Sequence, residues 1–172
     1  MADIYFDPKP RRDRDGDPET VSIIEHLFFA YRDFVGEPDA ILAELGFGRA
    51  HHRVLHFVHR NPGMTVAVLL EILQITKQSL ARVLKNLIET GYITQETGPD
   101  DRRQRLLYTT KQGADLAEKL IAIQSSRIEG ALQTLPKGGR NDVRDFLRAL
   151  MNDPVTPLES LNTAGKPGET SS

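Results

Sequence analysis

The pattern of apolar and polar positions changes twice within residues 62–110, and these changes predict a central structural unit. Over 66–73 the apolar residues recur on one face of a helix, which Thr65 is placed to cap. After a corner of two or three residues, a second amphipathic helix is expected from Thr76 to Thr90, ended by Gly91. Beyond that glycine the helical period of 3.6 gives way to an alternation of two, which is typical of strands.

Two strands are expected at 92–97 and 105–110, because both segments are rich in β-branched and aromatic residues. The residues between them, 98–104, are hydrophilic and open with Gly98-Pro99, which indicates a turn. A tight helix pair followed directly by a hairpin predicts a winged helix-turn-helix. The fold class expected is therefore mainly α, with a two-stranded β-wing.

Further amphipathic helices flank this unit. They are expected at 19–35, where Gly36 ends the helix, and then at 38–45, 48–60, 111–132 and 141–151. The first and the last two carry more apolar surface than one small domain needs, so a homodimer built from terminal helices is expected. The predicted organisation is a flexible tail at 1–18, one domain at 19–152 and a disordered tail at 153–172. Within the domain, dimerisation helices occupy 19–35 and 111–151, and a DNA-binding unit occupies 49–110.

Composition narrows the class of protein. The 172 residues are 39% hydrophobic and 27% charged with a net charge of −2, and the pI is about 6.2. No apolar run is long enough to cross a membrane and no signal peptide is visible, so a cytoplasmic protein without membrane contact is expected. Cysteine is absent, which excludes disulfides, thiolate metal sites and thiol redox sensing.

Positive charge is concentrated in the second helix of the pair and at the wing. Lysine and arginine suit phosphates, whereas arginine, glutamine and asparagine can pair with base edges. Asp101 is expected to pair with Arg103 and support the wing. The predicted DNA-binding residues are Thr76, Lys77, Gln78, Ser79, Arg82 and Lys85 on the helix, and Arg102, Arg103 and Arg105 on the wing.

The same residues also allow other interpretations. The polar helix face can be an ordinary solvated surface, and the charged turn can be a self-neutralising loop. A winged helix can also bind an acidic partner protein without reading DNA. An enzyme is not expected, because the sequence has no phosphate-binding glycine loop, nucleophile elbow or clustered carboxylates.

Histidines at positions 52, 56 and 59 fall on one face of the helix expected at 48–60. Two histidines one turn apart can hold a metal ion. No carboxylate or thiolate lies nearby in the sequence to complete such a site, so packing and hydrogen bonding is the preferred interpretation. Neither a metal nor a cofactor is predicted.

The wing and the residues after it resemble the MarR family of bacterial transcription regulators. The resemblance rests on Asp101-Arg102-Arg103, a following strand, and then Thr110-Lys111-Gln112-Gly113; Thr109 departs from it, because the family usually has leucine there. The run from Arg49 to His56 is similar to a PetP-like branch of that family. The resemblance implies a homodimeric repressor that binds a near-palindromic operator in double-stranded DNA. It also implies release by a small-molecule effector, with His26, His52 and His56 as candidates to line the effector pocket.

Overall fold

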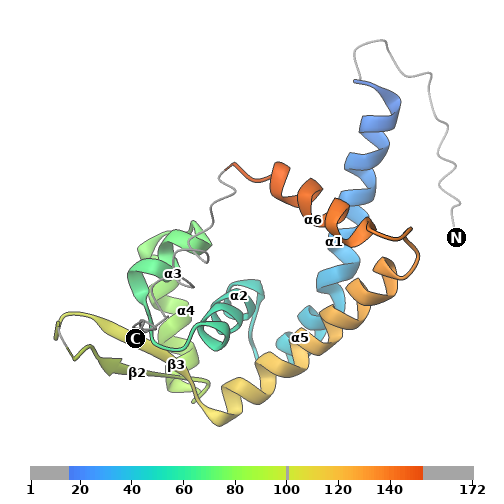
Figure 1. Ribbon diagram of the computed structural model, residues 1–172. Coiled ribbons are helices and arrows are strands. Elements are labelled where there is room, and N and C mark those ends of the chain that lie inside the picture. The colour runs from blue at the N-terminus through green and yellow to red at the C-terminus, as the bar shows by residue number, and fades with distance from the viewer. Residues whose placement is uncertain (1–15, 100, 153–172) are drawn as a thin grey trace, which may run out of the picture. The chain divides into compact units, whose positions relative to one another are not determined.

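The structure is a computed structural model that describes residues 16–99 and 101–152. Most of the tail predicted at 1–18 and all of the tail predicted at 153–172 lie outside the described residues. The elements within them are α1 (Pro18–Glu44), α2 (Arg49–Arg60), β1 (Met64–Thr65), α3 (Val66–Leu73), α4 (Lys77–Glu89), β2 (Ile93–Thr97), β3 (Arg105–Thr109), α5 (Lys111–Leu132) and α6 (Gly139–Ala149) (Figure 1). No helix of these ranges is long and apolar enough to cross a membrane.

The first helix differs from the sequence prediction. The predicted break at Gly36 is wrong, because α1 continues through Gly36 and Pro38 to Glu44. Proline lacks an amide hydrogen, so it removes one helical hydrogen bond and usually breaks a helix. Here the side chain of Pro38 is fully buried, as is that of Leu42 one turn later. Burial of these two side chains offsets the lost hydrogen bond.

Two compact units divide between Gly36 and Glu37. In the first unit, Asp17 caps the start of α1, because its Oδ2 accepts hydrogen bonds from the amide and the hydroxyl of Thr20, both at 3.0 Å. The apolar residues that follow on this part of α1 are exposed; they are Ile23, Ile24, Leu27, Phe28, Phe29 and Tyr31.

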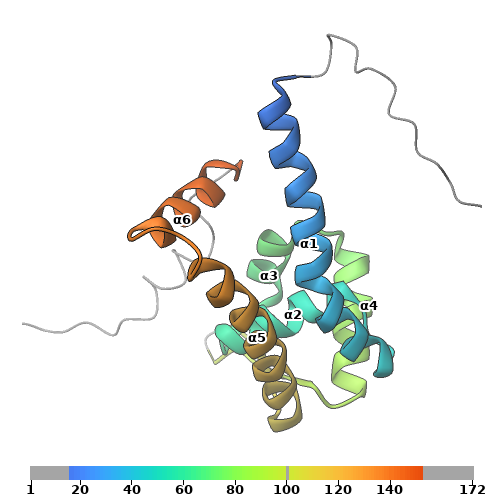
Figure 2. The same ribbon diagram turned by 90° about the vertical axis from the view of Figure 1, so that its right-hand side faces the viewer.

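The second unit has its core around α2. This helix packs against α3, α4, α5 and β3, and both views show it in the middle of these elements (Figures 1 and 2). Its buried residues are Val54, Leu55 and Val58. They meet leucines from the neighbouring helices, and the most buried of these are Leu69, Leu73, Leu80, Leu87 and Leu120. This core packs α3 and α4 against α2.

The sheet has three antiparallel strands in the order β1-β3-β2, rather than two. β2 and β3 form the predicted hairpin, with Ile93 opposite Thr109 and Thr97 opposite Arg105. The additional strand is β1, whose Met64 lies opposite Leu107 of β3. Because β1 has only two residues, no alternation in the sequence could indicate it.

Candidate nucleic-acid interface

The corner between α3 and α4 is built from backbone geometry and one arginine. Gln74 has a left-handed backbone with φ of 51°, which a non-glycine residue seldom adopts. Its amide donates to Leu70 O at 3.0 Å and its side chain donates to Glu71 O at 2.6 Å, so both groups close the end of α3. Arg53 of α2 donates to Leu73 O at 3.1 Å, which satisfies another carbonyl at this helix end.

The start of α4 is capped as the sequence predicts. Thr76 Oγ1 accepts a hydrogen bond from the Ser79 amide at 3.1 Å, and its hydroxyl donates to Ser79 Oγ at 2.9 Å. Thr76 and Ser79, two predicted DNA-binding residues, are therefore in direct contact. The hydroxyl of Ser79 keeps its own hydrogen as a donor for another group.

The two faces of α4 are clearly different. Its apolar face is buried and consists of Leu80, Val83, Leu84 and Leu87. The side chains of Lys77, Gln78, Arg82 and Lys85 are exposed. Lys85 forms an ion pair with Glu89 at 3.7 Å, which partly neutralises it. In the described residues, no ion pair is seen for Lys77 or Arg82.

The wing turn is held by its backbone. The Gly98 amide donates to Gln104 O at 3.1 Å, and the Gln104 amide donates to Asp101 O at 3.0 Å. Asp101 Oδ1 accepts from the Arg103 amide at 2.9 Å, so the contact between these two residues in the described chain is made through the backbone of Arg103. The aspartate side chain is short, so its carboxylate reaches the backbone amide two residues later more readily than it reaches the distant guanidinium of Arg103. The carboxylate therefore shapes the turn and does not hold the arginine side chain.

The three wing arginines are not equivalent. Arg105 donates through Nη1 to Thr97 Oγ1 at 2.6 Å, across the strand pair, which holds its side chain beside β2. Arg102 and Arg103 are exposed, and neither has an ion pair in the part of the chain that the structure describes. They are therefore the wing cations that are freest to meet a phosphate.

A hollow that the sequence gave no reason to expect separates the wing from the start of α3. Its volume is about 400 Å³, and it is lined by Thr65, Val66, Ala67, Arg103, Gln104 and Arg105. The pairing of β1 with β3 brings Thr65 of one segment beside the base of the wing. Since β1 was not predicted, nothing in the sequence pattern indicated this proximity.

The histidines named for an effector pocket lie in two different units. His26 belongs to the first unit; it is exposed, and its Nδ1 lies 2.6 Å from Ser22 O. His52 and His56 lie on α2 in the second unit and are partly buried. Nearby, His59 Nε2 lies 3.8 Å from Glu118 Oε1 of α5. Within the described ranges, no group of three or more histidine or carboxylate side chains is placed to hold a metal ion.

Burial lowers the pKa of both His52 and His56. The charge of the neighbouring Asp39 opposes this effect at His52. The charges of His52, Arg60 and His59 lower the pKa of His56 further. In the unfolded chain these histidines bind protons as the pH falls below their ordinary pKa of 6.5. In the folded chain they bind protons only at lower pH. Stability conferred by a neutral histidine is present above pH 6.5 and is lost as the pH falls below it.

We therefore expect the free energy of unfolding to decrease between pH 7.5 and pH 5.5. Urea unfolding at several pH values measures this decrease. The His56→Gln variant should show a flatter dependence, because glutamine does not titrate. A stability that rises on acidification, or an unchanged slope in the variant, would contradict the assignment.

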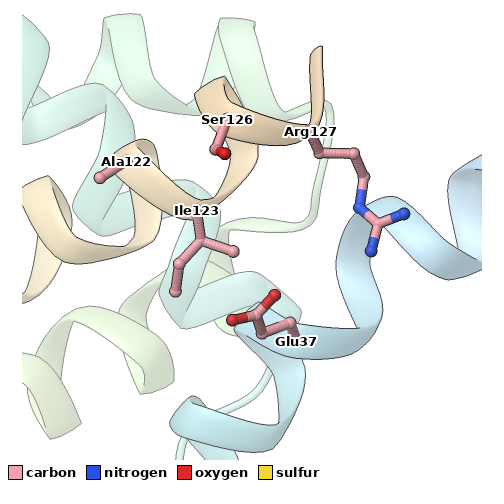
Figure 3. Close-up of a pocket in the computed structure, with 5 residues that line it drawn as sticks. All are labelled: Glu37, Ala122, Ile123, Ser126 and Arg127. Atoms are coloured by element: carbon pink, nitrogen blue, oxygen red, sulfur yellow. The ribbon is translucent and has the colours of Figure 1, made fainter. Parts of the chain in front are cut away.

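A larger hollow, of about 530 Å³, lies beside α5 in the second unit. It is lined by Glu37, Ala122, Ile123, Ser126 and Arg127, and none of the predicted pocket histidines lines it. Figure 3 shows Glu37 on the end part of α1 opposite Ile123, with Arg127 one turn further along α5. The walls thus offer an apolar patch, a hydroxyl and one charge of each sign.

A capped helix pair, a polar exposed face on its second helix and an adjoining β-wing define a winged helix-turn-helix protein. Residues 45–104 match the model of the MarR family. The chain is 43% identical over 129 residues to the HTH-type transcriptional regulator PetP of Rhodobacter capsulatus, covering 75% of this chain and 78% of that protein. The chain therefore belongs to the MarR family and is a DNA-binding transcription regulator, not an enzyme.

Solved structures share the fold at low sequence identity. FabT of Streptococcus pneumoniae, in complex with DNA, has a TM-score of 0.65 at 18% identity, covering 77% of this chain and 99% of that one. NadR in complex with 4-hydroxyphenylacetate has a TM-score of 0.63 at 18% identity, covering 83% and 97%. The mainly helical winged fold predicted from the sequence and the resemblance to the MarR family are both confirmed.

Proposed function

We propose that the chain is a homodimeric repressor that reads a near-palindromic operator with two copies of α4. The observation that carries this proposal is the exposed row of Lys77, Gln78 and Arg82 beside a capped helix start. These side chains supply phosphate contacts and base-edge contacts from one helix. Such a regulator works in the cytoplasm, where it can occlude a promoter.

The wing extends the proposed contact. Arg103 enters the minor groove beside the major groove that α4 occupies, and Arg102 contacts the backbone. Arg105 is held against Thr97 and Lys85 against Glu89. For that reason, both contribute less than the unpaired cations. The FabT structure, which contains DNA, supports an analogous use of this fold here.

Selection of bound duplexes from random DNA tests this function. We expect enrichment of a near-palindrome with half-sites about one helical turn, ~34 Å, apart. The affinity for that site should fall by roughly one log unit of binding constant per log unit of salt for each neutralised phosphate. Absence of an enriched sequence, or an affinity that salt leaves unchanged, would rule out sequence-specific reading.

Dimerisation is proposed from two apolar surfaces that the single chain leaves exposed. One is the start of α1 described above. The other is on α6 and its C-cap residue, where Val143, Phe146, Leu147 and Leu150 are exposed at 37–56%. Exposed apolar residues grouped on a helix are typical of an interface. A two-fold dimer covers them and places two reading helices on one side.

Light scattering should therefore give twice the chain mass of 19.3 kDa. The double variant Phe146→Asp, Leu150→Asp should shift the mass to that of one chain, because it places charges in an apolar interface. Asn141→Ala, on the polar side of α6, should leave the dimer intact. A wild-type chain that is monomeric at micromolar concentration would refute the dimer.

Release by a small-molecule effector is the last part of the proposal. The hollow beside α5 has the size of a small-molecule site, and Arg127 offers a partner for a carboxylate. The NadR structure contains 4-hydroxyphenylacetate, an aromatic carboxylate, which supports testing that class of compound here. To act, the ligand must bind more tightly to the form in which the two α4 helices are wrongly spaced.

A further inference from the structure

The end of α4 and the start of α5 meet in a joint formed by Gly91, Tyr92, Thr110 and Gly113. On the α4 side, Gly91 adopts a φ of 79°. The Gly91 amide donates to Ile88 O at 3.0 Å, and the Tyr92 amide donates to Leu87 O at 2.8 Å. This pair of hydrogen bonds is a Schellman motif, which fixes the direction in which the chain leaves the helix.

Thr110 connects this helix end to α5 with three hydrogen bonds. Its hydroxyl donates to Gly91 O at 2.6 Å, and the same oxygen accepts from the Gly113 amide at 3.1 Å. Its own amide donates to Tyr92 O at 3.1 Å. One side chain therefore caps α5 and binds the residue that ends α4.

Gly113 allows the two backbones to touch. A Cβ atom at this position would lie 1.9 Å from Tyr92 O. No flexible side chain therefore lies between the first turn of α5 and the segment that leaves α4. A contact of backbone against backbone is stiff, because neither side can change its rotamer.

Tyr92 anchors the joint in the core. Its side chain is 7% exposed, and its ring meets Phe47 edge-on at 5.0 Å between centroids. Phe47 in turn stacks on His51 of α2 at 4.9 Å. The joint is thus continuous with the packing of α2.

We propose that Thr110 is a positioning residue that fixes the direction of α4 relative to α5, and hence the spacing of the two reading helices. The inference rests on the proposed dimeric DNA reading for its functional consequence. α4 has 13 residues and is therefore about 20 Å long. A rotation of roughly 10° at the joint moves the far end, where Lys77 and Gln78 lie, by about 3 Å. That displacement is close to the ~3.4 Å rise of one base pair, so even a small loosening of the joint affects spacing.

The geometry of the joint can be measured without DNA. The chain has no cysteine, so Ala81→Cys on α4 and Ala131→Cys on α5, both at exposed positions, give a specific pair of spin labels. Labelled chains diluted into unlabelled protein report the distance within one chain. We expect one narrow distribution in the parent protein and in Thr110→Ser, which keeps the hydroxyl. Thr110→Ala should broaden or shift the distribution by about 2 Å or more, because Ala81 lies nearer to the joint than Lys77 does.

A distribution in folded Thr110→Ala as narrow as that of the parent, and centred at the same distance, would overturn the proposal. If circular dichroism shows that Thr110→Ala is unfolded, Thr110→Val at the same position provides the comparison. The proposal also requires that Thr110→Ser, which keeps the hydroxyl, shows the same distance distribution as the parent protein. If Thr110 contributed only to stability, the distance would not depend on the hydroxyl. Unfolding of both variants would also overturn the proposal, since it would make Thr110 a stability residue.

The functional consequence is measured on the selected operator and on a copy with one base pair inserted between its half-sites. The parent protein should discriminate strongly between the two. Thr110→Ala should bind an isolated half-site with unchanged affinity and lose at least threefold of the spacing discrimination. An unchanged ratio, or a parallel loss on the half-site, would contradict a positioning role. If the parent protein binds no DNA, the proposed function is wrong. The label distances then still show whether Thr110 fixes the direction of α4 relative to α5.

Discussion

Replacing Gly113 by alanine is expected to destabilise the chain by about 3 kcal/mol or more. The new methyl group would lie 1.9 Å from Tyr92 O, and the neighbour in this contact is backbone, which cannot move aside as a flexible side chain could. Elsewhere in a helix the same substitution stabilises, because alanine has the higher helix propensity. The expected sign is therefore opposite to the one that sequence propensity gives.

Gly130 provides the matched control in the same helix. No atom lies within 4 Å of a Cβ built at that position. Gly130→Ala should leave the chain unchanged or stabilise it by up to about 1 kcal/mol. Urea unfolding of the two variants and the parent protein measures both effects. Equal stabilities for Gly113→Ala and Gly130→Ala would show that the two backbones are not in contact.

Replacing both Arg82 and Arg103 by alanine is expected to lower the affinity for DNA strongly. Each guanidinium that contacts a base edge or a phosphate contributes about 1–3 kcal/mol, and the two arginines share no partner among the described residues. Their combined loss corresponds to at least a thirtyfold weaker complex, by roughly 2 kcal/mol or more. The single variant Arg103→Ala should weaken binding by a few kcal/mol at most, because it removes one charged hydrogen-bonding group.

Titration of the selected operator, with parent and variant proteins at one salt concentration, measures this loss. Lys137→Ala, an exposed cation in the turn between α5 and α6, is the control and should bind as the parent does. Both arginines are exposed, so unfolding stability should not change. If the double variant bound the operator with an affinity within threefold of that of the parent protein, the proposed contacts of α4 and the wing tip with DNA would be wrong.

Several features of the fold could be predicted because their determinants are local. Thr65 and Thr76 each accept from an amide three residues later, and this is the spacing at which an N-cap side chain reaches the helix. The apolar period placed α5 at Lys111–Leu132, as observed. The buried face of α4 also follows from its period, which left the polar residues on the exposed side.

Other features could not be predicted because they depend on contacts between distant segments. Pro38 remains inside α1 because the core buries it, whereas local rules would break the helix there. The left-handed backbone of Gln74 is supported by hydrogen bonds that close α3, including one to Leu73 O from Arg53, 20 residues earlier. Asp101 binds the Arg103 amide and leaves the guanidinium free, a choice that depends on the path of the turn.

By itself, the sequence determined where the hairpin and the helices after α1 lie and which side chains of α4 face solvent, because the periods and caps act over one or two turns. Only the tertiary structure decided how the reading unit is joined to α5. That joint depends on a hydrogen bond between Thr110 and Gly91, 19 residues apart, and on a backbone contact that only a glycine permits. Such contacts leave no periodic trace in a sequence, since they involve single residues that meet only after the core has packed.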